Sequence, residues 1–339
     1  MTEAPATRVG DQDAPREEKA AHLVVSLESV REAARGLEGV AVRTPLIHAP
    51  GLARLVGEPV ALKGEHLQPV GAFKIRGAYT AISRLSAADR VRGVITYSSG
   101  NHGQAVAYAA ARLGTRAVVV MPDHAPAIKV EGVKRHGGEV RMGGPTSATR
   151  REKAETTAQA EGLTIIPPFD DFNVIAGQAT CSLEILEQAP DVATLIVPVG
   201  GGGLLAGACI VVAALRPDIQ VIGVEPTGAA KLAAAMAAGS PVPLDRTESI
   251  ADGLLPLAIG SLTFPIIRPV VGDTVQVNDA QITEAVRVLS RECGIRAEPS
   301  GAATAAALLA GAVRPSGPTV AIVSGGNVDP TLFQRLVDA

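Results

Sequence analysis

Short runs of branched apolar residues alternate with longer helical segments along most of this chain. Such runs lie at 94–97, 117–120, 194–199, 219–224 and 319–323. Strands that alternate with helices pair in parallel, because each crossover helix carries the chain back to the end where the previous strand began. The sequence therefore predicts an α/β protein with open parallel sheets. Ligands of such sheets bind beyond the carboxyl ends of the strands, so the loops after these runs are candidate sites.

Length, charge and aromatic content limit the partners of the chain. Its 339 residues are enough for two domains, and residues 239–273, rich in Pro, Asp and Gly, predict an irregular connection. Five phenylalanines, three tyrosines and no tryptophan are too few for base stacking, and a net charge of −3 opposes binding to a phosphate backbone. No apolar run approaches the roughly 18 residues of a membrane span. We expect a small-molecule partner, with no nucleic acid and no membrane.

Cysteine and histidine usage indicates a cytoplasmic protein without a metal site. Cys181, Cys209 and Cys293 are widely spaced and odd in number, which is typical of unpaired cysteines in a reducing compartment. The six histidines form no i,i+4 pair and no cluster with cysteine, so no zinc ligands are predicted. Residues 1–20 mix charges with proline and lack an apolar segment, which predicts a disordered tail rather than a signal peptide.

The loop after the run at 194–199 consists only of glycine. Its members are Gly200, Gly201, Gly202 and Gly203. A backbone without side chains can turn its N–H groups toward an anion, and the next helix adds partial positive charge, so this loop predicts a phosphate site. With Ala206 the glycines also fit the G-x-G-x-x-A pattern, and Glu225 ends the following strand. A dinucleotide-binding oxidoreductase is therefore one alternative.

A lysine at the start of a predicted helix is the candidate reactive amine. Lys74 lies in the segment GAFKIRGA at 71–78. The helix dipole and burial beside Phe73 and Ile75 both disfavour a positive charge on this amine. Schiff-base chemistry with a carbonyl compound requires the neutral amine. Taken by itself, the segment favours the alternative of a surface lysine whose charged end reaches solvent.

Four motifs occur in an order that resembles one enzyme family. They are GAFKIRGA at 71–78, SSGNHGQ at 98–104, PVGGGG at 198–203 and SGGN at 324–327. Together they resemble the fold type II pyridoxal-phosphate enzymes, specifically the threonine dehydratase and serine racemase family. The resemblance extends from about residue 25 to residue 330.

The resemblance implies a tryptophan synthase β-like fold of two open α/β domains with the cofactor in the cleft between them. The large, cofactor-binding domain would comprise 21–82 and 169–339. The small domain, 83–168, would be mobile and close on the substrate. Homodimers are common in this family, so a homo-oligomer is expected.

The resemblance also assigns residues to the cofactor, pyridoxal 5'-phosphate. Lys74 would form the Schiff base with it, and Phe73 would pack against its ring. Asn101 would hydrogen-bond the phenolic oxygen and Ser324 the pyridine nitrogen. Because a serine hydroxyl does not protonate the ring, the cofactor would be a moderate electron sink that favours loss of a β-hydroxyl. The phosphate would be held by the amides of Gly200, Gly201, Gly202, Gly203 and Leu204.

Substrate contacts follow from the same resemblance. Arg150 would reach the substrate carboxylate, and Glu298 would lie near the substrate amine or the ring. Ser99 would act as an acid/base group on the face of Cα opposite Lys74, as inversion of configuration requires. The N–H groups of the loop that opens the next helix would bind the carboxylate; its members are Ser98, Ser99, Gly100, Asn101 and His102.

Two segments depart from the serine racemase pattern. Glu225 and Ala229 match its divalent-cation site, but Lys231 replaces the acidic residue, and an ammonium disfavours a cation there. The segment at 252–260 has lost serines that face the substrate in racemase and has gained one residue. The more apolar pocket that results would suit threonine or a bulkier β-hydroxyamino acid.

The predicted function is α,β-elimination by a threonine dehydratase, an ammonia-lyase with Lys74 and Ser99 as catalytic residues. It would convert L-threonine, and more weakly L-serine or another β-hydroxyamino acid, to a 2-oxo acid and ammonia. Since Ser99 also permits inversion, a serine racemase is the main alternative. The oxidoreductase and a non-catalytic ligand-binding protein are further alternatives.

Overall fold

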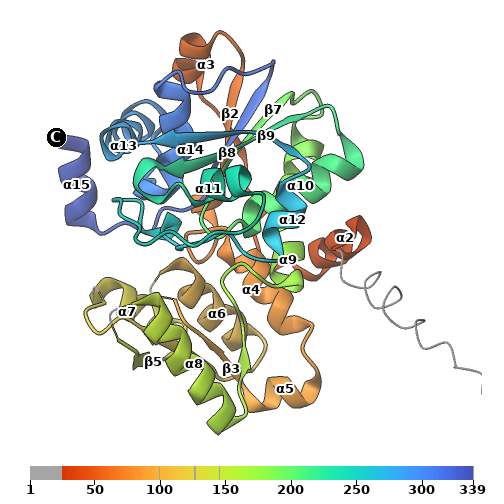
Figure 1. Ribbon diagram of the computed structural model, residues 1–339, viewed down its shortest axis with the longest axis vertical. Helices are drawn as coiled ribbons and strands as arrows, with labels where there is room; N and C mark the ends of the chain where they lie inside the picture. The colour runs from red at the N-terminus through yellow and green to blue at the C-terminus, as the bar shows by residue number, and fades with distance from the viewer. Residues whose placement is uncertain (1–24, 99, 126, 145, 339) are drawn as a thin grey trace, which may run out of the picture.

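The computed structural model describes residues 25–98, 100–125, 127–144 and 146–338. They form two β-sheets with flanking helices, arranged as an upper and a lower lobe (Figure 1). The predicted tail at 1–20 lies outside the described residues. Among the described helices, none combines the length and the apolar character needed to cross a membrane.

The sheet of the upper lobe has six strands in the order β1–β2–β10–β7–β8–β9. All neighbours are parallel except β1, which runs antiparallel to β2. Every residue of β7 and β10 is buried, because a parallel sheet is covered on both faces. The strand bounds are β1 (Leu46–His48), β2 (Val60–Gly64), β7 (Thr194–Pro198), β8 (Gln220–Pro226), β9 (Val271–Val277) and β10 (Thr319–Val323).

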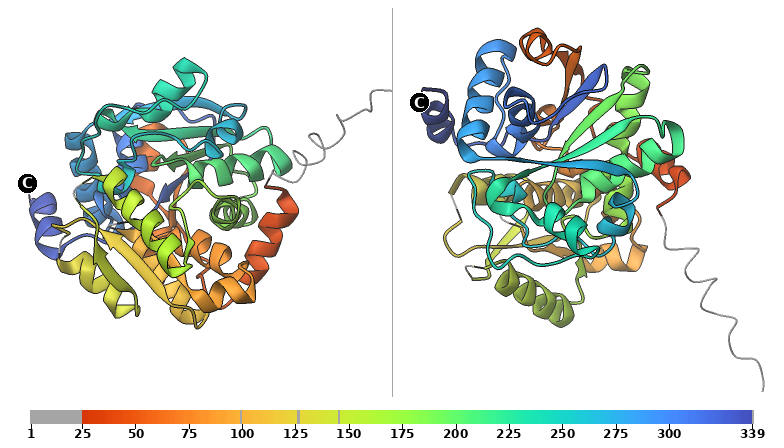
Figure 2. Two further views of the ribbon diagram at one scale, coloured as in Figure 1. Left: turned by 60° about the horizontal axis from the view of Figure 1, so that its bottom comes forward. Right: turned by 45° about the horizontal axis from the view of Figure 1, so that its top comes forward.

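Helices pack on both faces of this sheet (Figure 2). One face contacts α2 (Leu27–Gly36), α9 (Phe172–Gln188), α10 (Gly203–Leu215) and α12 (Thr263–Ile267). The other contacts α3 (Pro50–Val56), α13 (Asp279–Cys293) and α14 (Pro299–Leu309). Two more helices belong to this lobe: α11 (Lys231–Ala238), which follows β8, and α15 (Pro330–Asp338), which packs on α13. Short 3-10 turns lie at Glu65–Leu67, Thr227–Ala229 and Asp252–Leu254.

The lower lobe contains a four-stranded parallel sheet in the order β5–β4–β3–β6. Its strands are β3 (Val94–Thr96), β4 (Ala117–Met121), β5 (Glu139–Met142) and β6 (Thr164–Ile165). Its helices are α5 (Ala87–Arg92), α6 (Asn101–Arg112), α7 (Ala127–Arg135) and α8 (Ser147–Glu161). A further helix, α4 (Lys74–Ser83), packs against both α9 and α6 and so lies at the junction of the lobes.

The five predicted strands are present as β3, β4, β7, β8 and β10, within one or two residues of their expected ends. Two expectations are wrong. The strands are not all parallel, since β1 forms an antiparallel edge. The connection at 239–273 is not wholly irregular, since it contains α12 and the first residues of β9. The domain boundaries after 82 and 168 stay a prediction.

Candidate active site

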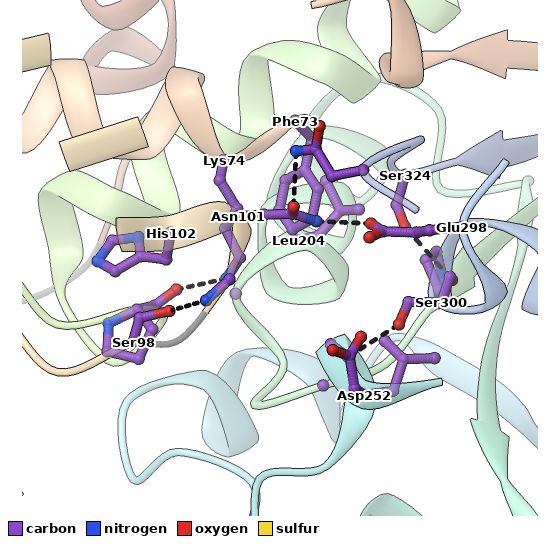
Figure 3. Close-up of a pocket in the computed structure, with 18 of the residues that line it drawn as sticks. Phe73, Lys74, Ser98, Asn101, His102, Leu204, Asp252, Glu298, Ser300 and Ser324 are labelled. Carbon is purple, nitrogen blue, oxygen red and sulfur yellow. Dashed lines mark hydrogen bonds between the residues drawn. The ribbon is translucent and has the colours of Figure 1, made fainter. Parts of the chain in front are cut away.

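A pocket between the two lobes gathers the loops that follow β3, β7 and β10 (Figure 3). Parallel strands bring these loops to one end of each sheet, which explains why segments far apart in sequence meet there. Phe73 and Lys74 enter the pocket from the start of α4. The strand-end residues that line it are Ser98, Gly100, Asn101, Pro198, Gly200, Gly202, Gly203, Leu204, Ser324 and Asn327.

The Lys74 amine lies inside this pocket. Its Nζ donates a hydrogen bond to the carbonyl oxygen of Pro168 (2.7 Å) and lies 5.1 Å from the centre of the Phe73 ring. Burial lowers the pKa of Lys74 to about 8, because surrounding protein replaces the water that would solvate its charge. Part of the amine population is therefore uncharged near neutral pH, and an uncharged amine is the nucleophile for a carbonyl group.

The glycine loop leads into α10 with its backbone open toward the pocket. Gly202 has φ 96°, a left-handed conformation, and a Cβ atom there would lie 2.8 Å from Oγ1 of Thr263. No described side chain caps α10 at this residue. The first N–H groups of the helix are therefore available to an anion. Gly201 does not line the pocket; its carbonyl oxygen accepts hydrogen bonds from Gly260 and Thr263.

Asn101 is held by hydrogen bonds on both sides of its amide. Its Nδ2 donates to Oε1 of Glu298 (2.5 Å), and its Oδ1 accepts from Nδ2 of Asn327 (2.8 Å). Burial, with a smaller contribution from the Asp252 charge, raises the pKa of Glu298 to about 8. Glu298 is therefore largely a neutral acid at pH 7, and Figure 3 shows it pointing toward Asn101.

The loop after β10 forms the wall opposite Lys74. Ser324 is buried, and its Oγ donates to the carbonyl oxygen of Ser300 at 3.4 Å. The Ser324 carbonyl oxygen accepts from the backbone N–H of Phe73 (3.1 Å), which ties this loop to the start of α4. Ser324 thus faces the pocket from the end of β10, as a contact to a ring nitrogen would require.

The remaining predicted residues lie at different places. His102 lines the pocket, and its Nε2 lies 3.0 Å from the carbonyl oxygen of Ile166. Burial lowers the pKa of His102 to about 3, so its imidazole is neutral near pH 7. The Ser98 Oγ accepts from the N–H of Gly100 (3.4 Å). Arg150, on α8, donates to Ser147 Oγ (3.0 Å) and is not among the residues that line the described pocket. Ser99 lies outside the described residues.

The pocket contains polar residues that the sequence analysis gave no role. Lys129 of α7 and Asp252 both line it and form an ion pair across the junction of the lobes. Asn327 belongs to one of the four motifs, and its Nδ2 donates hydrogen bonds to Oδ1 of Asn101 (2.8 Å) and to the carbonyl oxygen of Val70 (2.7 Å). Ser300 also lines the pocket, and the sequence indicates this only through its position two residues after Glu298.

The profile of the family described as "Pyridoxal-phosphate dependent enzyme" matches residues 37–325. The chain belongs to this family. An L-threonine ammonia-lyase of Thermotoga maritima is 38% identical over 316 residues, which cover 93% of this chain and 79% of that protein. A serine racemase of Oryza sativa subsp. indica is 39% identical over 309 residues, 89% of this chain and 91% of that protein. The structure of maize serine racemase matches with a TM-score of 0.89 at 38% identity, covering 93% of this chain and 97% of that one.

Pyridoxal 5'-phosphate is therefore the cofactor, and the fold type II prediction is confirmed. The pocket of this pyridoxal-phosphate enzyme fits the group: a partly neutral lysine amine and an uncapped helix start line one cavity. Relatives of both the dehydratase and the racemase kind are similarly close, so the family does not choose between these reactions.

The dinucleotide alternative conflicts with the contacts of Glu225. This carboxylate is fully buried, and its two oxygens accept hydrogen bonds from the N–H groups of Leu232 (2.7 Å) and Ala233 (3.0 Å). It caps α11 and is not available to a ribose hydroxyl, which is the role that a dinucleotide site would require.

Proposed function

We propose that this enzyme is a threonine dehydratase, an ammonia-lyase that forms a 2-oxo acid and ammonia from L-threonine. The observation that carries the proposal is the Lys74 amine, which is buried in the cofactor pocket with a pKa of about 8. Such an amine takes up a proton near neutral pH, as the base of an elimination must. L-serine and other β-hydroxyamino acids are expected to be weaker substrates.

The residues of the chain support each proton movement. Pyridoxal phosphate, when bound, would supply the electron withdrawal that makes the proton on the substrate Cα acidic. Lys74 would take that proton, the electron pair would form the Cα–Cβ double bond as the Cβ–O bond breaks, and one proton would join the leaving hydroxyl to give water, which balances the proton removed from Cα. Water then hydrolyses the enamine to the 2-oxo acid and ammonia. Asn101 and Ser324 would orient the cofactor, and the glycine loop would bind its phosphate.

The wall near Asp252–Leu254 supports threonine over serine. Leu254 lines the pocket and is buried, and the next residues, Leu255 and Pro256, are also apolar. An apolar wall favours the additional methyl group of threonine, since one buried methylene contributes about 0.8 kcal/mol. We expect kcat/KM for L-threonine to exceed that for L-serine by about fourfold or more on this contribution alone.

The decisive experiment measures cofactor and products together. The purified protein should be yellow with bound cofactor, and it should release 2-oxo acid and ammonia from L-threonine in equal amounts. Lys74→Ala should lose the covalently bound cofactor and all turnover. Turnover that persists in this variant would overturn the role of Lys74, and ammonia-free conversion of L-serine to D-serine would overturn the lyase assignment.

Serine racemase is the second candidate, because a racemase is as similar to this chain as an ammonia-lyase. Inversion needs a second acid/base group, and Ser99 remains the proposed one. Ser99→Ala should abolish any racemisation while elimination continues. Racemisation that survives this substitution would show that another group serves the second face of Cα.

The cellular compartment and the oligomeric state of the enzyme belong to the same proposal. We infer a cytoplasmic homodimer, with the segment at 83–168 closing on the substrate. Sedimentation velocity of the holoenzyme at micromolar concentration tests the dimer directly: a mass near twice the 34.5 kDa of one chain supports it, and a monomer contradicts it.

A further inference from the structure

A fully buried lysine lies directly behind the glycine loop. Lys231 begins α11, and its side chain has no exposed surface. Its Nζ donates hydrogen bonds to three backbone carbonyl oxygens, those of Ala229 (2.8 Å), Leu254 (3.0 Å) and Val199 (3.1 Å). An ammonium has three protons, so every donor is used.

One carboxylate balances this charge. Oε1 of Glu225, itself fully buried, lies 3.4 Å from the Lys231 ammonium. Burial lowers the pKa of Lys231, and the Glu225 charge opposes that lowering. Burying a charge costs several kcal/mol, and well-packed apolar residues often replace a buried ion pair without loss of stability. A charged side chain here therefore calls for a reason other than core stability.

The ligand set around the ammonium is that of a hard cation. Three carbonyl oxygens and a carboxylate surround a single positive centre, and oxygen donors of these kinds bind Ca²⁺, Mg²⁺ and similar ions. The observed N–O separations of 2.8 to 3.1 Å exceed the roughly 2.0–2.6 Å of Mg²⁺ and Ca²⁺ coordination. A separate ion does not fit while the ammonium is present, because Lys231 occupies the position at which the chain departs from the serine racemase cation site.

The oxygens that Lys231 joins belong to different walls of the active site. Val199 immediately precedes the glycine loop, and Leu254 lies in the pocket wall that faces it. These walls approach closely, because a Cβ atom on Gly200 would lie 3.1 Å from the Gly253 carbonyl oxygen. Ala229 anchors the ammonium to the turn after β8. The ammonium therefore fixes the spacing between the phosphate loop and the opposite wall.

We propose that Lys231 is a built-in cation: its ammonium holds the glycine loop and the Asp252–Leu254 wall in the arrangement that binds cofactor, and the enzyme needs no added metal or alkali cation. Lys231 is a positioning residue, since it does not line the pocket in the described part of the chain. The proposal rests on the family cofactor and is independent of which reaction the enzyme performs.

The first test compares cations in the wild type and in Lys231→Ala. Cofactor affinity and melting temperature of the wild type should not change when KCl is replaced by choline chloride at equal ionic strength, or when a chelator is added. Lys231→Ala should bind pyridoxal phosphate at least tenfold more weakly. NH₄⁺ or K⁺, but not choline, should restore much of that affinity in a saturable way, because these ions match the vacated space.

A second buried lysine provides the matched control. Lys63 is also fully buried, but its Nζ contacts only one backbone carbonyl, that of Thr44 (2.7 Å), together with the side chains of Glu184 (2.6 Å) and Gln188 (2.8 Å). Lys63→Ala should lower the melting temperature without gaining a selective response to NH₄⁺ or K⁺. Equal rescue of both variants would overturn the proposal.

Lys231→Asp keeps the proposal testable if the alanine variant does not fold. Two carboxylates and the carbonyl oxygens then form a divalent site, so Ca²⁺ or Mn²⁺ should raise its melting temperature and cofactor affinity in a saturable way. A wild type that requires an added cation, or Lys231 variants that respond to no cation, would overturn the proposal. Neither readout uses substrate turnover, so failure here is distinct from failure of the lyase assignment.

Discussion

At the scale of single residues, burial sets the protonation of the reactive amine. The pKa of Lys74 in the folded protein is about 8, below the ordinary 10.5, so the nucleophilic amine appears as pH rises through 8. We predict that the rate at which apoenzyme takes up pyridoxal phosphate rises with pH, with a midpoint near 8. Stopped-flow absorbance of the bound cofactor measures this rate. A midpoint near 10.5 would show that Lys74 is solvated like a surface lysine.

The raised pKa of Glu298 predicts that the stability of the folded apoenzyme falls as pH rises. The folded pKa of Glu298, about 8, lies above the ordinary 4.5, so the folded apoenzyme holds a proton that the unfolded chain has lost. This contribution to stability is fully present below about pH 4.5 and is lost as pH rises toward 8. Glu298→Gln should therefore raise the melting temperature of apoenzyme relative to wild type at pH 8 more than at pH 5.

Calorimetry at the two pH values checks this prediction. Glu284→Gln is a suitable control, because Glu284 is exposed on α13 and pairs with Arg287 on its own helix. Its effect should be small at both pH values. A Glu298→Gln variant that is less stable than wild type at pH 8 would show that the charged carboxylate is the favoured form.

Individual residues were predictable only where their chemistry is local. The four glycines stand out because they form a bare loop before a helix, whereas Lys74 stands out only because its motif occurs in order with three others. The hydrogen bond between Asn101 and Glu298 joins residues that are 197 positions apart, so no local sequence pattern predicts it. Lys231 looked like a replaced ligand in the sequence, whereas its three carbonyl contacts become visible only in the fold.

At the scale of elements, the start of α10 depends on one backbone conformation. Gly202→Ala places a side chain at φ 96°, which costs about 1–2 kcal/mol, and brings its Cβ against Thr263. The loop then shifts, and we predict at least tenfold weaker binding of pyridoxal phosphate to the apoenzyme. Fluorescence titration measures this affinity.

Gly239→Ala is a control that separates general loss of stability from displacement of the glycine loop. Gly239 ends α11 with φ 73°, but a Cβ atom there meets only the end of the Arg268 side chain, 3.7 Å away. This variant should lose similar stability to the left-handed conformation and retain its cofactor affinity. If both variants lost affinity equally, global destabilisation rather than the phosphate loop would be responsible.

The elements that the sequence predicted are those with buried, continuous apolar runs. β7 and β10 are buried along their whole length, so their composition alone identifies them. β9 lies at the edge of its sheet with Gly272, Asp273 and Gln276 exposed, and it pairs on one side only. Edge strands carry such polar residues to avoid further pairing, which is why the sequence does not predict this strand and places its first residues, 271–273, in an irregular connection.

At the scale of the whole molecule, an ion pair joins the two lobes across the pocket in the described part of the chain. Lys129 belongs to α7 of the lower lobe, and Asp252 belongs to the wall of the upper lobe that Lys231 holds. Their side chains are 22% and 51% exposed, so the pair is screened by solvent and stabilises the contact between the lobes only modestly. A contact of this strength is compatible with the proposed movement of the segment at 83–168.

The last prediction concerns this contact between the lobes. Lys129→Met should raise KM for L-threonine by up to about fivefold with little change in kcat, because a half-exposed ion pair contributes about 0.2–1 kcal/mol. KM of the wild type should also rise with ionic strength, since salt screens the pair, and the variant should lose much of that dependence. Lys134→Met is the control, because Lys134 is exposed and pairs with Glu131 on its own helix.

Charge reversal distinguishes an ion pair between the lobes from a direct contact of Lys129 with substrate. The double variant Lys129→Asp with Asp252→Lys restores an opposite-charge pair across the same junction, so its KM should fall below that of either single variant. If Lys129 instead contacted the substrate, the reversed pair would recover nothing, because the ammonium would then stand on the other lobe. The recovered KM therefore measures how far substrate binding depends on the ion pair between the two lobes.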